Sequence, residues 1–149
     1  SRGDEKYTEI RVVSMREDVN RVGIEELRTV AEVDCAGPNQ AGTTMVVLNS
    51  ICGCVAGRMR PAVRAALQHS SRPEKLFSVF AGQDKEATDR ARSYFAGYLP
   101  SSPSIALLRD GKVVHMMQRS DIEHREAADI AAELKKAFDK FCAKPAPVG

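Results

Sequence analysis

Two cysteines separated by one glycine, Cys52-Gly53-Cys54, are the residues of this 149-residue chain best suited to chemistry. They follow an apolar, β-branched stretch, residues 43–51, that is typical of a strand covered on both faces. A stretch with helical character, residues 55–69, comes next. The thiols therefore fall at a strand end and on the first turn of a helix, where free backbone amides and the helix dipole stabilise an anion. This position favours a thiolate at Cys52, the nucleophile that thiol–disulfide exchange requires.

Positive charge close to the cysteine pair acts in the same direction. Residues 49–72 contain Arg58, Arg60, Arg64 and Arg72 and no acidic residue, and neighbouring cations favour the ionised thiol. We expect Arg58 and Arg60 to hold carboxylates of an anionic thiol; for Arg58, a solvated position on the helix face is an equal alternative.

The short spacing of the two cysteines also bears on their chemistry. A disulfide across Cys-x-Cys closes a tighter ring than one across Cys-x-x-Cys, and strained disulfides are more readily reduced. Gly53 tolerates the backbone angles that such a ring demands. The competing interpretation, that both cysteines only fill space in a buried core, does not explain their place between a strand and a helix.

Metal binding is the second alternative. Cys35, Cys52, Cys54 and Cys142 could together supply four thiolates to a zinc or iron–sulfur site. The chain has one close cysteine pair, however, whereas zinc sites usually present two pairs. Outside such a site, we expect Cys35 to be a small buried hydrophobe. For Cys142 we expect an exposed spare thiol, with a third redox partner as the alternative.

Strands and helices alternate along the chain after residue 42. The patterns predict strands at residues 43–51, 76–80, 104–108 and 112–117, helices at 55–69 and 84–98, and a closing helix with the apolar face Ile130, Leu134, Ala137, Phe138 and Phe141. The last two strands are joined by Asp110-Gly111, a typical hairpin turn. This order predicts an α/β protein with a thioredoxin-like fold, in which helices cover both faces of a mixed central sheet.

The chain is expected to form a single domain over residues 1–149. Residues 1–42 read as a helical N-terminal extension, with an amphipathic helix at 7–22 and a second, short helix that begins at the capping box of Thr29 and Glu32. Residues 43–142 form the redox core.

Composition excludes several function classes. The 22 basic and 20 acidic residues leave a net charge of +2, too small for a nucleic-acid-binding protein. No apolar run approaches the ~20 residues of a membrane span, and the N-terminal residues do not resemble a secretory signal. Four cysteines are too few for a disulfide scaffold, so we expect a cytoplasmic protein without metal or prosthetic group.

Several segments resemble the bacilliredoxins, a family of thioredoxin-fold proteins with a Cys-Gly-Cys motif. The central segment is residues 49–57 (NSICGCVAG), followed by Arg60-Pro61-Ala62. The resemblance continues in residues 80–88, 94–95, 100–104, 107–108, 110–112, 114–116 and 122–123 and in the C-terminal helix that ends at Cys142. It therefore covers most of the chain from about residue 43 onward.

The resemblance implies an enzyme that reduces mixed disulfides between client proteins and the small thiol bacillithiol, its co-substrate. Disulfide isomerisation by the same motif is the alternative within this class. Cys52 is implied as the attacking thiol and Cys54 as the resolving thiol, and Pro103 is implied as a cis-proline that faces them.

The substrate-binding residues are expected to be Ser102, Pro103, Gly53 and Arg60. Pro103 also has a case independent of the resemblance, because the X–Pro bond is the context in which a cis peptide costs only ~0.5–1 kcal/mol. A cis bond here would present backbone groups to a docking peptide. The partners expected are client proteins and the small thiol.

Overall fold

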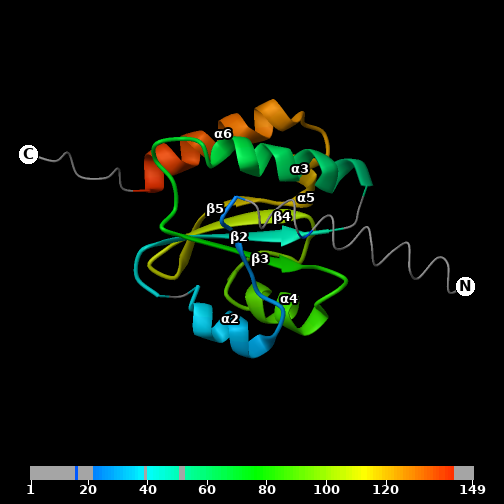
Figure 1. Ribbon diagram of the computed structural model, residues 1–149, viewed down its shortest axis with the longest axis vertical. Helices are drawn as coiled ribbons and strands as arrows, with labels where there is room; N and C mark the ends of the chain where they lie inside the picture. Colours follow the sequence, from blue (N-terminus) through cyan, green and yellow to red (C-terminus); the bar gives the residue numbers. More distant parts are fainter. Residues whose placement is uncertain (1–15, 17–21, 39, 51–52, 143–149) are drawn as a thin grey trace, which may run out of the picture.

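The computed structural model describes residue 16 and residues 22–38, 40–50 and 53–142, without the side chain of Cys54 (Figure 1). Its elements are β1 (Glu25–Glu26), α2 (Val30–Ala36), β2 (Thr43–Asn49), α3 (Gly53–Ala66), β3 (Lys75–Phe80), α4 (Lys85–Arg92), β4 (Ser104–Arg109), β5 (Lys112–Met117), α5 (Arg119–Ile122) and α6 (Ala127–Phe141). The helix expected at 7–22 lies almost entirely outside these residues.

A five-stranded mixed sheet forms the centre of the molecule, in the order β1-β3-β2-β4-β5. Strands β1, β3 and β2 are parallel, whereas β4 runs antiparallel to β2 and β5 antiparallel to β4. Helices α3 and α6 cover one face of the sheet, and α2 and α4 cover the other (Figure 1). The expected thioredoxin-like α/β architecture is confirmed.

Strand β2 lies in the middle of the sheet, and all seven of its residues are buried. Its side chains alternate between the two faces: Met45 and Val47 pack with α3 and α6, and Val46 and Leu48 pack on the α2 and α4 side. A strand covered on both faces has no polar side to expose, which explains its continuous apolar sequence.

The N-terminal segment expected to be helical also contributes a strand. Residues 24–27 run beside β3, where β1 pairs in parallel and the Leu27 amide donates to the Ser78 carbonyl at 2.7 Å. Ile24 packs into the cluster under α3 and α6, and Leu27 packs into the opposite cluster. Side chains three positions apart point to opposite faces of a strand, so this conformation buries both.

Helix α2, which follows β1, begins at the residue expected from the sequence. Thr29 is its N-cap and accepts a hydrogen bond from the Glu32 amide at 3.1 Å. The helix ends at Gly37, whose φ of +63° is accessible to glycine at little cost.

The helix expected over 84–98 is shorter than its pattern suggests. Helix α4 ends at Arg92, and the amides of Tyr94 and Phe95 then bond to carbonyls three residues back, at 3.1 and 2.9 Å. These tight turns place Phe95 in the core cluster beside α4. The chain then turns away at Gly97, which has a φ of +86°.

The hairpin between β4 and β5 confirms the expected turn. Asp110 and Gly111 both have positive φ, +52° and +82°. The Asp110 carboxylate accepts from the Gly42 amide at 2.8 Å, and the Asp110 amide donates to the Gly42 carbonyl at 2.9 Å. The turn therefore also fixes the residue that precedes β2.

Cys35 and Cys142 lie on opposite sides of the sheet, and both expectations for them are wrong. Cys35 is exposed, because Val33 is the α2 residue that faces the sheet. Cys142 is buried at 4% exposure, because it follows Phe138 by four residues and shares its core-facing side. Burial raises the pKa of the Cys142 thiol above its usual value. The two thiols cannot converge on one metal ion.

None of the described helices is both long and apolar enough to span a bilayer.

The face of α6 that covers the sheet should dominate the stability of this layer. Phe138 is fully buried, whereas Phe141 in the same helix is only partly buried. Phe138→Ala should lower the free energy of unfolding by about 3–5 kcal/mol, because it removes contacts and leaves a cavity. Urea denaturation followed by circular dichroism measures this, with Phe141→Ala as the matched control of smaller effect. Equal losses would contradict the packing described.

The two thiols outside the Cys-Gly-Cys motif should differ in accessibility. In the native protein near neutral pH, iodoacetamide should modify Cys35 quickly, since it is exposed. Cys142 should react only after denaturation, because it is buried and its raised pKa keeps it protonated. Peptide mapping by mass spectrometry separates the sites, and rapid native labelling of Cys142 would show that the end of α6 opens readily.

Candidate active site

The Cys-Gly-Cys motif is bracketed by two well-defined elements. Strand β2 ends at Asn49, and α3 begins at Gly53. Cys52, the residue immediately before Gly53 in the chain, and the side chain of Cys54 lie outside the described residues, so their geometry is not assigned. The structure does describe the segments next to the motif in the chain: the end of β2 and the rest of α3.

A buried guanidinium fixes the end of β2. Arg60, about two turns into α3, reaches back so that Nη1 donates to Asn49 Oδ1 and to the Ser50 carbonyl, both at 3.1 Å. The Ser50 amide donates to Asn49 Oδ1 at 2.9 Å, and the Asn49 carbonyl accepts from the Ala81 amide at 2.9 Å. Arg60 is only 8% exposed. Two of the contacts of its guanidinium are therefore with polar groups at the end of β2, and its expected part in substrate binding stays a prediction.

The loop before β4 lies at the same end of the sheet. The Ser102–Pro103 peptide bond is cis, as expected, and Pro103 is buried. Ser104 pairs with Leu48 in the antiparallel register of β4 and β2. The loop that contains Ser102 and Pro103 therefore leads into β4 beside the end of β2, the strand that precedes the cysteine motif in the chain.

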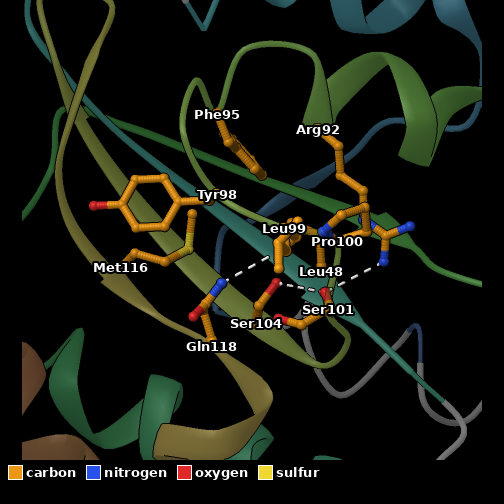
Figure 2. A pocket seen from close by; sticks show the side chains of 10 residues that line it. All are labelled: Leu48, Arg92, Phe95, Tyr98, Leu99, Pro100, Ser101, Ser104, Met116 and Gln118. Atoms are coloured by element: carbon orange, nitrogen blue, oxygen red, sulfur yellow. Dashed lines mark hydrogen bonds between the residues drawn. The ribbon is translucent and has the colours of Figure 1, made fainter.

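Hydrogen bonds from neighbouring elements hold this loop. The Ser101 carbonyl accepts from Arg92 Nη2 at 3.2 Å and from Ser104 Oγ at 3.0 Å (Figure 2). On another side, the Arg119 amide donates to Ser101 Oγ at 3.3 Å, and Arg119 Nη1 lies 3.4 Å from the Ser102 carbonyl. The loop is thus held by the last residue of α4 and the first residue of α5.

Helix α5 brings a residue to the site that the sequence patterns did not identify. Arg119 is the first residue of α5, separated from β5 by the N-cap residue Gln118, and its Nε lies 3.4 Å from Glu123 Oε2. Arg58, half-buried on α3, donates from Nη2 to the Glu123 carbonyl at 2.6 Å, so α5 is tied to the helix that carries Cys54. The one available sequence signal was the pairing of Gln118 with Asp121, which forms a capping box and predicts a helix start after β5.

A small hollow lies beside the loop, on the side of α4. Figure 2 shows its ten lining residues, with the side chains of Tyr98 and Leu99 at its rim. The space inside it is about 10 Å³, room for about one water molecule. Leu99 is 83% exposed and Tyr98 is 42% exposed. The hollow thus adjoins exposed apolar surface next to Ser102 and Pro103.

The residues that the structure describes do not favour the metal alternative. Among residues 16, 22–38, 40–50 and 53–142, no cluster of histidine, cysteine and acidic side chains is arranged to hold a metal ion. Cys35 and Cys142 are separated by the sheet, on α2 and at the end of α6. A site with four thiolates from this chain is therefore excluded by the fold.

Known sequences match nearly the whole chain. Residues 7–142 match the family model described as disulphide isomerase. The chain is 59% identical over 136 residues to a bacilliredoxin of Koribacter versatilis. The alignment covers 91% of this chain and 94% of that protein. A bacilliredoxin of Geobacillus kaustophilus is 50% identical over 136 residues and covers 91% of this chain and 92% of its own length.

Solved structures agree on the fold. The oxidised thioredoxin of Plasmodium falciparum superposes with a TM-score of 0.56 at 16% identity, over 81% of this chain and all 100% of that one. A thioredoxin of Malassezia sympodialis gives a TM-score of 0.58 at 7% identity, over 81% of this chain and 92% of its own. At such low identity these matches establish the architecture alone. Together with the sequence matches, they show that the chain belongs to the bacilliredoxin family and is a thiol–disulfide oxidoreductase with a thioredoxin fold.

Proposed function

We propose that Cys52 and Cys54 reduce mixed disulfides between client proteins and a low-molecular-weight thiol, bacillithiol. The observation that carries this proposal is the place of the motif in the chain. Cys52 stands between the end of the buried strand β2 and the first residue of α3, Gly53. The relatives' name, bacilliredoxin, supports the choice of thiol.

The reaction is written as two exchanges. The Cys52 thiolate attacks the small-thiol sulfur of the mixed disulfide, the S–S bond breaks, and the client leaves as a thiolate that takes up a proton. Cys54, as thiolate, then attacks the Cys52 sulfur, forms the Cys52–Cys54 disulfide and releases the small thiol. The substrate gains two electrons, which the cysteine pair loses. Two further molecules of small thiol, oxidised to their disulfide, return the pair to its reduced form.

The local charge supports an ionised Cys52. The first turn of α3 carries no acidic residue, and the motif lies next to the amides at that helix start, which favour an anion. The buried Arg60 guanidinium contacts Ser50, two residues before Cys52 in the chain. We therefore propose that Arg60 acts by fixing the strand end and by adding positive charge, rather than by binding substrate directly.

Substrate docking is proposed at the loop before β4. Ser102 and Pro103 directly precede Ser104, which pairs with Leu48 near the end of β2, and the exposed side chains of Tyr98 and Leu99 are nearby. Gly53 leaves the approach to the thiols free of a side chain. We propose that a client chain lies along this loop with its mixed disulfide toward Cys52. The reducing cytoplasm is the compartment proposed, and no prosthetic group is required.

A second activity of the same site is disulfide isomerisation. The description of the matching family model, disulphide isomerase, favours it. The first step is the same attack by Cys52, after which a thiol of the client, rather than Cys54, resolves the intermediate. Cys54 then acts as an escape from intermediates that do not rearrange. Recovery of activity by a scrambled disulfide protein would measure this activity separately.

The roles of the two cysteines can be separated by substitution. Cys52→Ser should abolish reduction of a bacillithiol mixed disulfide, because the attacking sulfur is lost. Cys54→Ser should still attack and then stall with one small thiol on Cys52, since the resolving sulfur is missing. Intact-mass spectrometry should show a single thiol adduct that a reductant removes.

Cys35→Ser is the matched control, because Cys35 is exposed on the far side of the sheet and should leave turnover unchanged. If Cys54→Ser turned over at the wild-type rate, Cys54 would not be the resolving thiol. If neither motif variant changed the reaction, the proposed function would be wrong.

The two motif thiols should also ionise differently. We expect Cys52 to have the lower pKa, because it is the residue nearest the strand end and the free amides at the start of α3. Alkylation by iodoacetamide, followed at each site against pH, should show Cys52 reacting at lower pH than Cys54. Faster alkylation of Cys54 near neutral pH would reverse the assigned roles.

A further inference from the structure

We propose that a groove between β5 and the C-terminal half of α6 binds an acidic, extended segment of a partner protein. This β5–α6 groove is lined by Val114 and His115 on β5 and by Lys136, Ala137, Lys140 and Phe141 on α6. It contains no residue of the cysteine motif, so the inference goes beyond the proposed function and does not depend on it.

A bulge in β5 forms one wall of the groove. Val114 is the extra residue of the bulge, because its neighbours 113 and 115 pair with consecutive residues of β4. The bulge re-aims the side chains, so that Val114 packs on the cluster under α6 and His115 Nε2 lies 2.9 Å from Glu133 Oε2 on that helix. A bulge also interrupts the hydrogen-bonding edge of a strand, so side chains rather than strand pairing should hold the occupant.

The groove is long enough for a short peptide. It contains about 290 Å³ of space. Past Glu133 and Lys136 it continues into a wider hollow of about 500 Å³, bordered also by Arg125 and Asp129. From residue 129 to residue 140 the axis of α6 rises about 16 Å, which is the length of about five residues of an extended chain.

Two lysines of α6 give the groove a positive charge. Lys136 and Lys140 are exposed, and in the part of the chain that the structure describes neither is paired with a carboxylate. Lys140 Nζ lies 5.2 Å from the centre of the Phe141 ring, which keeps this ammonium group beside the apolar floor of the groove. Asp139 of the same helix lies elsewhere, with Oδ1 2.8 Å from His69 Nε2.

The glutamate that borders the groove does not cancel the charge of the lysines. Glu133 accepts a hydrogen bond from Arg125 at one carboxylate oxygen, and its other oxygen lies next to His115. Burial raises the pKa of Glu133, but the hydrogen bonds of Arg125 and His115 outweigh burial and leave this pKa below its ordinary value. The charge of Arg125 therefore balances that of Glu133. Asp129 lies one turn before Glu133 on α6, away from Lys140.

Apolar side chains supply a second kind of contact. Val114 and Phe141 are only partly buried by the core, and Ala137 lies between them and the helix axis at 5% exposure. All three line the groove. An inorganic anion would leave this apolar floor in contact with water, whereas a segment with both acidic and apolar residues would cover it. The combination of apolar floor and lysine rim therefore favours a peptide.

The β5–α6 groove lies toward the end of the sheet where β2 begins. Lys112, the first residue of β5, pairs with Arg109, which pairs with Thr43, the first residue of β2. Figure 1 shows the C-terminal end of α6 and the start of α3 at opposite ends of the helical layer. A partner bound in the groove thus leaves the end of β2 uncovered. The protein can hold this partner while a substrate occupies the loop before β4.

The test measures the binding of a short, fluorescein-labelled peptide in which glutamate alternates with valine. Fluorescence anisotropy with the full chain should show affinity about tenfold higher than for the same peptide with glutamine in place of glutamate, because the lysines attract carboxylates. Added salt should weaken the binding. Glycine in place of valine should also weaken it, since the apolar floor loses its contact. In nuclear magnetic resonance spectra, the peptide should shift the amide signals of Val114, Ala137 and Phe141.

Substitutions on the protein locate the site. Lys136→Gln and Lys140→Gln should each weaken binding of the glutamate peptide about threefold, and the double variant about tenfold, because each change removes one exposed charge contact. Lys85→Gln is the matched control. Lys85 is also an exposed lysine, but it begins α4 on the opposite face of the sheet. The control should bind the peptide as the wild type does.

Four results would overturn the proposal. The first is equal binding of the glutamate and glutamine peptides, and the second is unchanged affinity of the double variant. If Lys85→Gln weakened binding as much as Lys136→Gln, overall charge rather than the groove would attract the peptide. If ultracentrifugation showed a dimer that the double variant dissociates, the occupant would be a second copy of this chain. The peptide contains no cysteine, so none of these results bears on the proposed reduction of mixed disulfides.

Discussion

The rest of the site depends on how the chain leaves β2. A strand buried on both faces must pass into a helix within a few residues, and the polar groups at its end need partners inside the protein. Arg60 supplies them: one guanidinium bonds to the Asn49 side chain and to the Ser50 carbonyl. A buried charge is tolerated only with such partners. The end of β2, which precedes the cysteine motif in the chain, is therefore fixed from within α3.

The same chemistry recurs around the site. Arg92 bonds to the Ser101 carbonyl, and Arg58 bonds to the Glu123 carbonyl. Each bond ties a helix to a loop at one end of the sheet, and each uses a neutral acceptor. Had these arginines been paired with carboxylates, the ion pairs would hold the loops equally well but cancel the charge. Carbonyl partners let these side chains position the loops without cancelling their positive charge, which is the sign that the proposed Cys52 thiolate needs.

The patterns of the sequence predicted the elements with a strong period or a specific turn. Strand β2, the hairpin at Asp110 and the closing helix are of this kind. The sequence patterns could not predict β1. A strand of two residues is too short to show a hydrophobic period, and it forms by pairing with β3. They overextended α4, since the apolar residues after Arg92 are buried by tight turns rather than by a helix. Such tertiary contacts have no local signature.

The direction of an arginine side chain is a further property that sequence does not settle. Arg60 and Arg119 are both arginines beside the site, yet one is 8% exposed and the side chain of the other is 41% exposed. Arg60 belongs to a helix packed against both the sheet and α6, so its guanidinium is enclosed. Arg119 stands at the start of the short helix α5, after the edge strand β5, and part of its side chain faces solvent. The exposure of each guanidinium is therefore set by how its element packs against the rest of the fold, and the local sequence does not contain that information.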